Sequence, residues 1–98
     1  MVIEIVRFKL VAEASPEKFV EAWHNTMPII SGFSGFIKRE LIFNEEANEW
    51  IDLVHWKSLQ EAKEAAAQFG QIPEIAPFGM MIDMSTADMS HFEQKASG

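Results

Sequence analysis

The sequence predicts an α+β fold, a ferredoxin-like four-stranded antiparallel sheet with two helices on one face, and three observations lead to it. Two apolar runs of strand length flank a polar loop within residues 36–56, which is typical of a long hairpin. One helical apolar pattern precedes this hairpin, another follows it, and a strand-like segment lies near each end of the chain. Joined by right-handed crossovers, the order β-α-β-β-α-β gives this topology. No linker divides the 98 residues, so we expect one domain over residues 1–93 and a flexible tail over residues 94–98.

Composition narrows the class of protein. Hydrophobic residues make up 48% and charged residues 23%, which is usual for a globular domain. The net charge of −7 and the lack of a Lys/Arg cluster predict no nucleic-acid binding. Without cysteine there is no disulfide and no thiolate chemistry. Charged residues interrupt the apolar start of the chain before it reaches the length of a membrane span, so we expect a cytoplasmic protein with no membrane partner.

The first strand and the first helix have clear local signals. Both faces of residues 2–10 are largely apolar at the N-terminal end, which favours an interior strand covered on both sides. Ser15 and Pro16 form a helix start, with Ser15 as N-cap and the proline at the first helical position. An apolar stripe at helical spacing then follows, and Pro28 with the turn at residues 32–35 limits its end.

The second half of the chain repeats this plan. Residues 58–61, Ser-Leu-Gln-Glu, form a capping box in which the serine and the glutamate each satisfy a free amide at the helix start. The helix that follows buries small residues and closes near Gly70. Two prolines make residues 72–79 a loop or a single helical turn, and the alternation over residues 86–93 predicts the last strand.

Alternation divides the hairpin into two faces. The set with more apolar residues is expected to face the helices, and it comprises Ile37, Arg39, Leu41, Phe43, Ile51, Leu53 and His55. The opposite face carries Phe36, Trp50, Val54 and Trp56, more aromatic surface than water alone would cover, so we expect these four residues to form the interface of a homodimer. A bulge or a one-residue slip would exchange the two sets.

Three segments resemble the dimeric α/β-barrel superfamily, especially the antibiotic biosynthesis monooxygenase-like (ABM) family. They are Ile-Ser-Gly-Phe-Ser-Gly-Phe at 30–36, Trp-Ile-Asp-Leu-Val-His-Trp-Lys-Ser at 50–58, and residues 83–92 with their Met-Ser-His-Phe end. The resemblance implies a homodimer whose two sheets form a barrel, and a pocket between sheet and helices in each subunit. It also implies, for an enzyme, oxidation without metal or flavin. The superfamily includes haem-degrading enzymes, isomerases and members without assigned function.

Two departures from the family patterns bear on the chemistry. Quinone-forming members use Tyr, Trp, Asn and Arg around a phenolic substrate, and this chain has no tyrosine. Haem-degrading members carry an asparagine on the first strand, where this chain offers Val6, Arg7 and Phe8.

Arg39 and His55 are the polar residues on the hairpin face assigned to the helices. In an apolar pocket His55 would act as general base and Arg39 would stabilise a developing oxyanion. The alternative is a satisfied core histidine and an arginine that pairs with a carboxylate such as Glu40 or Asp52.

Aromatic and methionine side chains at helical spacing suggest the pocket wall, although such stripes also form ordinary core. The expected lining is Trp23, His24, Met27, Phe69, Phe78 and Met81. The three histidines lie on three different elements without ligand spacing, so no metal site is expected, and no glycine-rich phosphate loop calls for a nucleotide cofactor.

The sequence therefore favours a monooxygenase-like homodimer that binds or oxidises a small hydrophobic, aromatic ligand without a cofactor. Two alternatives stay open: a non-catalytic ligand-binding or structural homodimer of the same fold, and a haem-binding or haem-degrading member.

Overall fold

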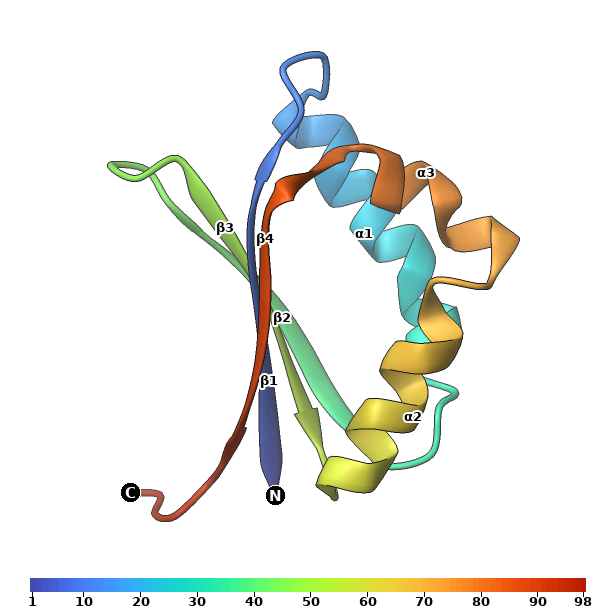
Figure 1. The fold of residues 1–98 in the computed structure, drawn as a ribbon, viewed down its shortest axis with the longest axis vertical. Helices are drawn as coiled ribbons and strands as arrows, with labels where there is room; N and C mark the ends of the chain where they lie inside the picture. Colours follow the sequence, from blue (N-terminus) through green and yellow to red (C-terminus); the bar gives the residue numbers. More distant parts are fainter.

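The computed structural model describes all 98 residues and has four strands and three helices. They are β1 (Val2–Leu10), α1 (Pro16–Ile30), β2 (Phe36–Asn44), β3 (Glu49–Trp56), α2 (Leu59–Phe69), α3 (Ala76–Met80), preceded by the single turn η1 (Pro73–Ile75), and β4 (Ile82–Glu93). The strands form one antiparallel sheet in the order β2-β3-β1-β4, and all helices cover one face of it (Figure 1). This arrangement confirms the predicted ferredoxin-like fold. None of the helices combines the length and the apolar character that crossing a membrane requires.

Side-chain caps start both long helices, as predicted. Ser15 Oγ accepts a hydrogen bond from the backbone N–H of Lys18 at 3.1 Å, with Pro16 as the first residue of α1. At α2, Ser58 Oγ accepts from the N–H of Glu61 at 3.2 Å. These bonds satisfy amides that would otherwise lack a partner at a helix start.

Glu61 also holds the turn before β2 against α2. Its carboxylate accepts hydrogen bonds from the hydroxyls of Ser34, at 2.6 Å, and Ser58, at 2.9 Å, and these bonds lower the pKa of Glu61. Gly35 lies next to this contact with φ of +85°, and a Cβ there would come within 2.6 Å of the Glu61 carboxyl carbon. Only glycine fits both the left-handed backbone and this close approach.

The register of the hairpin differs from the predicted facing. Arg39 pairs with Val54 and Leu41 with Asp52, while an irregularity between Phe36 and Lys38 brings Phe36 opposite Trp56. Because residues directly opposite share a face, the row of Trp50, Asp52, Val54 and Trp56 lies under the helices with Arg39.

The predicted dimer interface is therefore wrong in its residues. Trp50, Val54 and Trp56 are buried within the single chain, the last two only 1% exposed, and Phe36 packs edge-on against the Trp56 ring. In β3 both alternating sets are apolar, and Asp52 made the inner set look like the outer one. The residues predicted to face inward from β3, Ile51, Leu53 and His55, lie on the opposite face with Lys38 and Glu40.

The core between sheet and helices has two parts. One is centred on Phe19, whose ring packs edge-on against those of Phe8 and Trp50 and stacks on that of Phe78. The distances between ring centroids are 5.5 Å, 5.2 Å and 5.1 Å, in that order. Such ring pairs each contribute about 0.5–1.5 kcal/mol beyond area burial. The other part packs Val54 and Trp56 under the small residues Ala62 and Ala65 of α2, which allow a close approach to the sheet.

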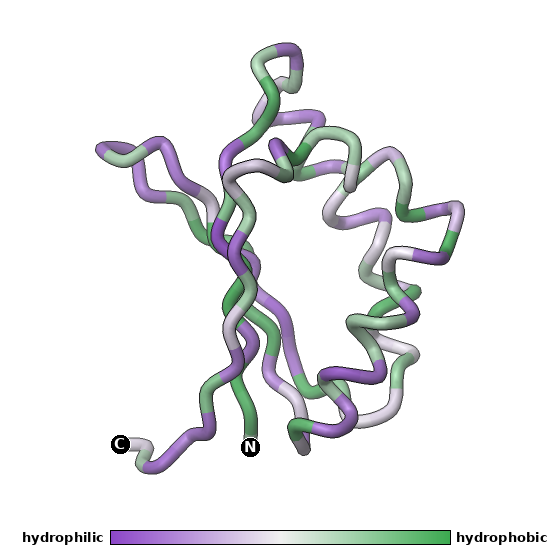
Figure 2. The backbone as a smooth tube through the Cα atoms, viewed as in Figure 1, coloured by the Kyte–Doolittle hydropathy of each residue, from purple (hydrophilic) through white to green (hydrophobic).

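The other face of the sheet, which we call the open face, has no helix over it (Figure 1). Ile3, Ile5 and Leu53 are partly buried there, and Phe92 is 52% exposed. The N-terminal half of β1, which supplies two of these residues, is hydrophobic in Figure 2.

Candidate functional site

A cavity of about 240 Å³ lies between the sheet and the helices, where the sequence predicted a pocket. Fourteen of its nineteen lining residues are hydrophobic, including Trp56 on β3, Phe69 on α2 and Phe78 on α3. Only three lining residues carry a charge, and they are Glu4, Arg39 and Asp52. An apolar cavity with a few polar groups is the usual form of a small-molecule site.

Arg39 and Asp52 form a bidentate ion pair in the cavity wall. Arg39 Nε lies 3.0 Å from Asp52 Oδ1, and Nη2 lies 2.7 Å from Oδ2. The arginine side chain is fully buried and that of the aspartate is 10% exposed. Two planar groups that share parallel hydrogen bonds make the strongest kind of side-chain ion pair. Each charge therefore satisfies the other.

Helix α1 supplies the remaining partners of the guanidinium. Arg39 Nη1 donates to Thr26 Oγ1 at 2.7 Å, and the Thr26 hydroxyl donates in turn to the Trp23 carbonyl at 2.7 Å. The Trp23 indole N–H donates to Asp52 Oδ1 at 3.3 Å, and its ring centroid lies 4.6 Å from the guanidinium carbon. Because its groups are engaged by the chain, Arg39 is not the free oxyanion donor that the sequence predicted; it is the paired arginine of the alternative interpretation.

Glu4 is the remaining charged group in the wall, and sequence reasoning did not single it out. It lies on the central strand β1, opposite Val54 of β3 and His91 of β4. Its Oε1 is 3.0 Å from His91 Nε2, and the residue is buried. Burial raises the pKa of Glu4, and the charge of Asp52 adds to this, while the hydrogen bond and charge of His91 and the charge of Arg39 lower it. Glu4 is thus a buried carboxyl group with a raised pKa in the wall of an apolar cavity.

Trp56 provides a hydrogen-bond donor without a partner. Trp56 is one of the cavity-lining residues, and its buried Nε1–H makes no hydrogen bond within the chain. A buried donor that stays unpaired costs about 1–3 kcal/mol. A ligand oxygen that reached this N–H would recover that energy.

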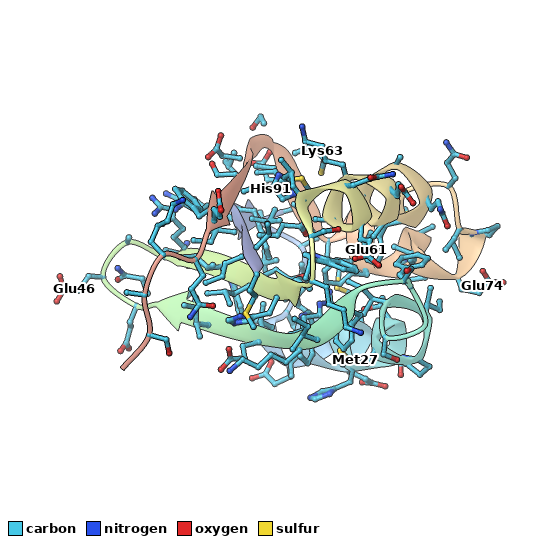
Figure 3. All side chains as sticks on the ribbon, turned by 90° about the horizontal axis from the view of Figure 1, so that it is seen from below. Met27, Glu46, Glu61, Lys63, Glu74 and His91 are labelled. Atoms are coloured by element: carbon cyan, nitrogen blue, oxygen red, sulfur yellow. The ribbon has the colours of Figure 1, made fainter.

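Only two of the six predicted pocket residues line the cavity. Phe69 and Phe78 line the cavity. Trp23 and Met27 lie behind its wall, where both contact the Arg39 guanidinium; Met27, on α1, is labelled in Figure 3. His24 is exposed and Met81 packs against the core around Phe19, so neither lines the cavity as predicted.

His55 is not in this cavity. It lies on the open face, opposite Ile3 of β1 and Lys38 of β2, with Nε2 3.6 Å from Glu40 Oε1. The prediction that His55 and Arg39 share one face is therefore wrong, because Arg39 pairs with Val54 and the neighbouring position on β3 points to the other side. The assignment of His55 as the base of this pocket fails with it.

Comparisons with known proteins place the fold. No family model matches the chain, and no curated protein matches it. SnoaB from Streptomyces nogalater, described as a cofactor-independent oxygenase, superposes with a TM-score of 0.77 at 18% identity, over 98% of this chain and 94% of its own. A protein described as an antibiotic biosynthesis monooxygenase gives 0.73 at 7% identity, over 98% and 100%. A variant of MhuD with two manganese protoporphyrin IX molecules bound per active site gives 0.73 at 18% identity, over 100% and 98%.

The chain has the antibiotic biosynthesis monooxygenase-like fold. At these identities the similarity concerns the fold, and the chemistry has to come from the cavity of this chain.

The cavity does not fit a haem held by histidine, one of the protein ligands of haem iron. None of the three histidines lines it: His91 is bonded to Glu4, His55 lies on the open face and His24 is exposed. No group of three or more His, Asp or Glu side chains that could hold a metal ion is present elsewhere in the chain.

The Arg39–Asp52 pair predicts a strong mutational coupling. Each single variant, Arg39→Met or Asp52→Leu, leaves a buried charge unpaired and should lower the free energy of unfolding by about 3–5 kcal/mol. The double variant should lose much less than the sum of the two single losses. Urea unfolding of the four proteins measures the coupling. Lys38→Met, which removes an exposed pair with Glu40 at 4.0 Å, is the matched control and should stay within about 1 kcal/mol. Single variants no less stable than this control would contradict the assignment.

The raised pKa of Glu4 predicts that the protein loses stability when the pH changes from acid to neutral. Its pKa is raised in the folded state, so its favourable contribution is complete below the ordinary glutamate pKa and is lost as pH rises through the raised value. Glu4→Gln removes this loss. Urea unfolding at about pH 4 and about pH 7 should therefore show the wild type losing stability relative to the variant. A constant difference between the two proteins would mean that Glu4 titrates normally.

Proposed function

We propose that this protein binds a small, flat, hydrophobic molecule in the cavity and oxidises it with O₂ without a metal or flavin. The observation that carries the proposal is the polar content of the cavity wall. Arg39 and Asp52 neutralise each other, which leaves Glu4 as the acid–base group and the Trp56 indole N–H as the free donor in an otherwise apolar site. SnoaB, described as a cofactor-independent oxygenase, has the same fold.

Such a site suits an aromatic compound with an acidic C–H, for which anthrone is a simple probe. Glu4 removes the proton, and the Trp56 N–H donates to the oxygen on which negative charge develops. The electron-rich carbanion then reduces O₂ to a peroxide on the same carbon, and the peroxide takes up one proton in place of the one that Glu4 removed. The O–O bond breaks: one oxygen atom stays as the new carbonyl, the other leaves as water with that proton and the second hydrogen of the carbon, and anthrone becomes anthraquinone. The apolar walls keep water from the reacting centre.

The second candidate is a non-catalytic binding protein. It is favoured by the fact that Arg39, the one cationic side chain that lines the cavity, already makes its hydrogen bonds to Asp52 and Thr26. In that case the cavity would hold its ligand through burial of apolar surface alone.

We also propose a homodimer in which the open faces of two copies pack together. Ile3, Ile5 and Leu53 form an apolar centre on this face, and Phe92 and Ile42 remain about half exposed. Two sheets packed face to face would cover these side chains. The face matches a second copy of itself because a two-fold axis brings the same apolar centre together from both sides.

Replacing Glu4 tests the chemistry. Glu4→Gln should lower the rate of anthrone oxidation, followed by O₂ consumption and anthraquinone absorbance, by about 100-fold or more, since it removes the acid–base group but keeps the shape. Binding of anthrone, measured by thermal shift, should persist. Glu13→Gln, at an exposed carboxylate outside the cavity, is the control. Unchanged turnover in Glu4→Gln would reject Glu4 as the base, and a wild type that binds without turnover would favour the non-catalytic candidate.

Sedimentation equilibrium tests the dimer. The wild type should have twice the 11.1 kDa mass of one chain, and Leu53→Glu, which puts a charge at the centre of the open face, should shift it to the monomer. Met80→Glu, on the highly exposed Met80 of α3, should leave the mass unchanged. A wild-type mass of one chain would contradict the proposal.

A further inference from the structure

A second hollow lies on the far side of His91 from the ligand cavity. It is an open groove of about 460 Å³ between the end of the sheet and the start of α2, lined by residues that include Lys57, Ser58, His91 and Glu93. Figure 3 shows His91 on β4 beside the first turn of α2. The His91 side chain is 17% exposed, so its ring meets solvent while most of it is covered.

One hydrogen bond joins the two hollows. Glu4 lines the ligand cavity and is absent from the groove, whereas His91 lines the groove and is absent from the cavity. Glu4 Oε1 and His91 Nε2 are 3.0 Å apart. The pairing of β1 with β4 places the two residues directly opposite each other, so the sheet itself fixes this contact.

We propose that His91 carries the proton that Glu4 takes from the ligand out to solvent in the groove. This inference rests on the proposed role of Glu4 and adds His91 as a positioning and proton-relay residue that does not touch the ligand.

The proton moves in two balanced steps. In the first, a C–H bond of the ligand breaks and an O–H bond forms on Glu4. In the second, the Glu4 proton passes to His91 Nε2 while the proton on Nδ1 leaves to water in the groove. After this step Nε2–H donates to the ionised Glu4, and a ring flip or a change of tautomer moves the proton to Nδ1 and frees Nε2 before the next transfer. The peroxide formed later takes up one proton in return, so the whole reaction releases none, and the relay lets Glu4 regain its ionised state from inside an apolar cavity.

Charged groups from several elements surround this pair. Glu4 faces His91, the carboxylate of Asp52 and the guanidinium of Arg39; the last two are paired with each other, so their fields on Glu4 largely offset. His91 faces Glu4 on one side, and Glu93 and Lys57 line the groove on the other. Burial raises the pKa of Glu4, which brings it closer to the range in which a neighbouring imidazole exchanges protons.

His91→Ala with chemical rescue is the test. The variant should lower kcat for anthrone oxidation by about tenfold or more with little change in KM, and free imidazole added to the buffer should enter the groove and restore the rate. His24→Ala, which removes an exposed histidine on α1, should keep the wild-type rate and gain nothing from imidazole. A His91→Ala rate equal to the wild type, or a lowered rate that imidazole does not raise, would overturn the relay.

A carbon-13 NMR titration of the Glu4 carboxyl in the ligand-free protein decides the same question without turnover. In the wild type this signal should report the ionisation of Glu4 in contact with His91. In His91→Ala the pKa of Glu4 should rise further, because the hydrogen bond and charge that lower it are gone. An unshifted titration would overturn the relay. If the wild type fails to oxidise anthrone, the proposed function fails for that substrate, and the titration alone decides whether Glu4 and His91 exchange protons as a pair.

Discussion

The buried ion pair between Arg39 and Asp52 determines which way the hairpin faces. A guanidinium with no exposed surface is tolerated only where a carboxylate and hydroxyl groups can surround it, and in this chain those groups lie between β2, β3 and α1. Once Arg39 points toward α1, its cross-strand neighbour Val54 must do the same. The alternating positions Trp50 and Trp56 then follow onto the helical side. A single polar contact thus places two of the three tryptophans in the core.

The same pair shapes the chemistry of the cavity. It removes one cation and one anion from the set of groups that a ligand could meet, and it leaves Glu4 on the central strand and Trp56 on its neighbour. The carboxyl group accepts or gives a proton, while the indole N–H can only donate a hydrogen bond. Proton removal at one end and stabilisation of an oxyanion at the other are the two operations that a direct reaction of an aromatic carbanion with O₂ requires. In the proposed relay, the bond from Glu4 to His91 extends proton removal to the groove at the surface of the protein.

Local signals were enough to predict the elements and their order. The caps at Ser15 and Ser58 start helices as expected, and two crossover units of this length have one favourable handedness. The facing of β3 was not predictable in this way. Both of its alternating sets are apolar, and the irregularity between Phe36 and Lys38 shifts the pairing. Asp52 suggested an outer face, because its partner Arg39 lies on another strand and could not be recognised from the pattern of β3 alone.

Glu4 shows what could have been found and what could not. Its alternation with Val2, Val6 and Phe8 places a carboxylate on an otherwise apolar face of a central strand, which is a signal of a functional or paired group. Its partner is 87 positions away in the sequence, on a strand whose pairing register depends on a bulge in β4. That separation hides the pair from any reading of local pattern.

The most direct test of the ligand cavity uses the three tryptophan indole N–H signals in a proton–nitrogen NMR spectrum. Titration with 2-naphthol, a small aromatic alcohol, should move the Trp56 signal, because this N–H has no partner in the chain and Trp56 lines the cavity. The Trp23 signal, bonded to Asp52 behind the wall, and the Trp50 signal should move far less. Saturable binding that leaves Trp56 unmoved, or that shifts the His55 ring on the open face instead, would contradict the account.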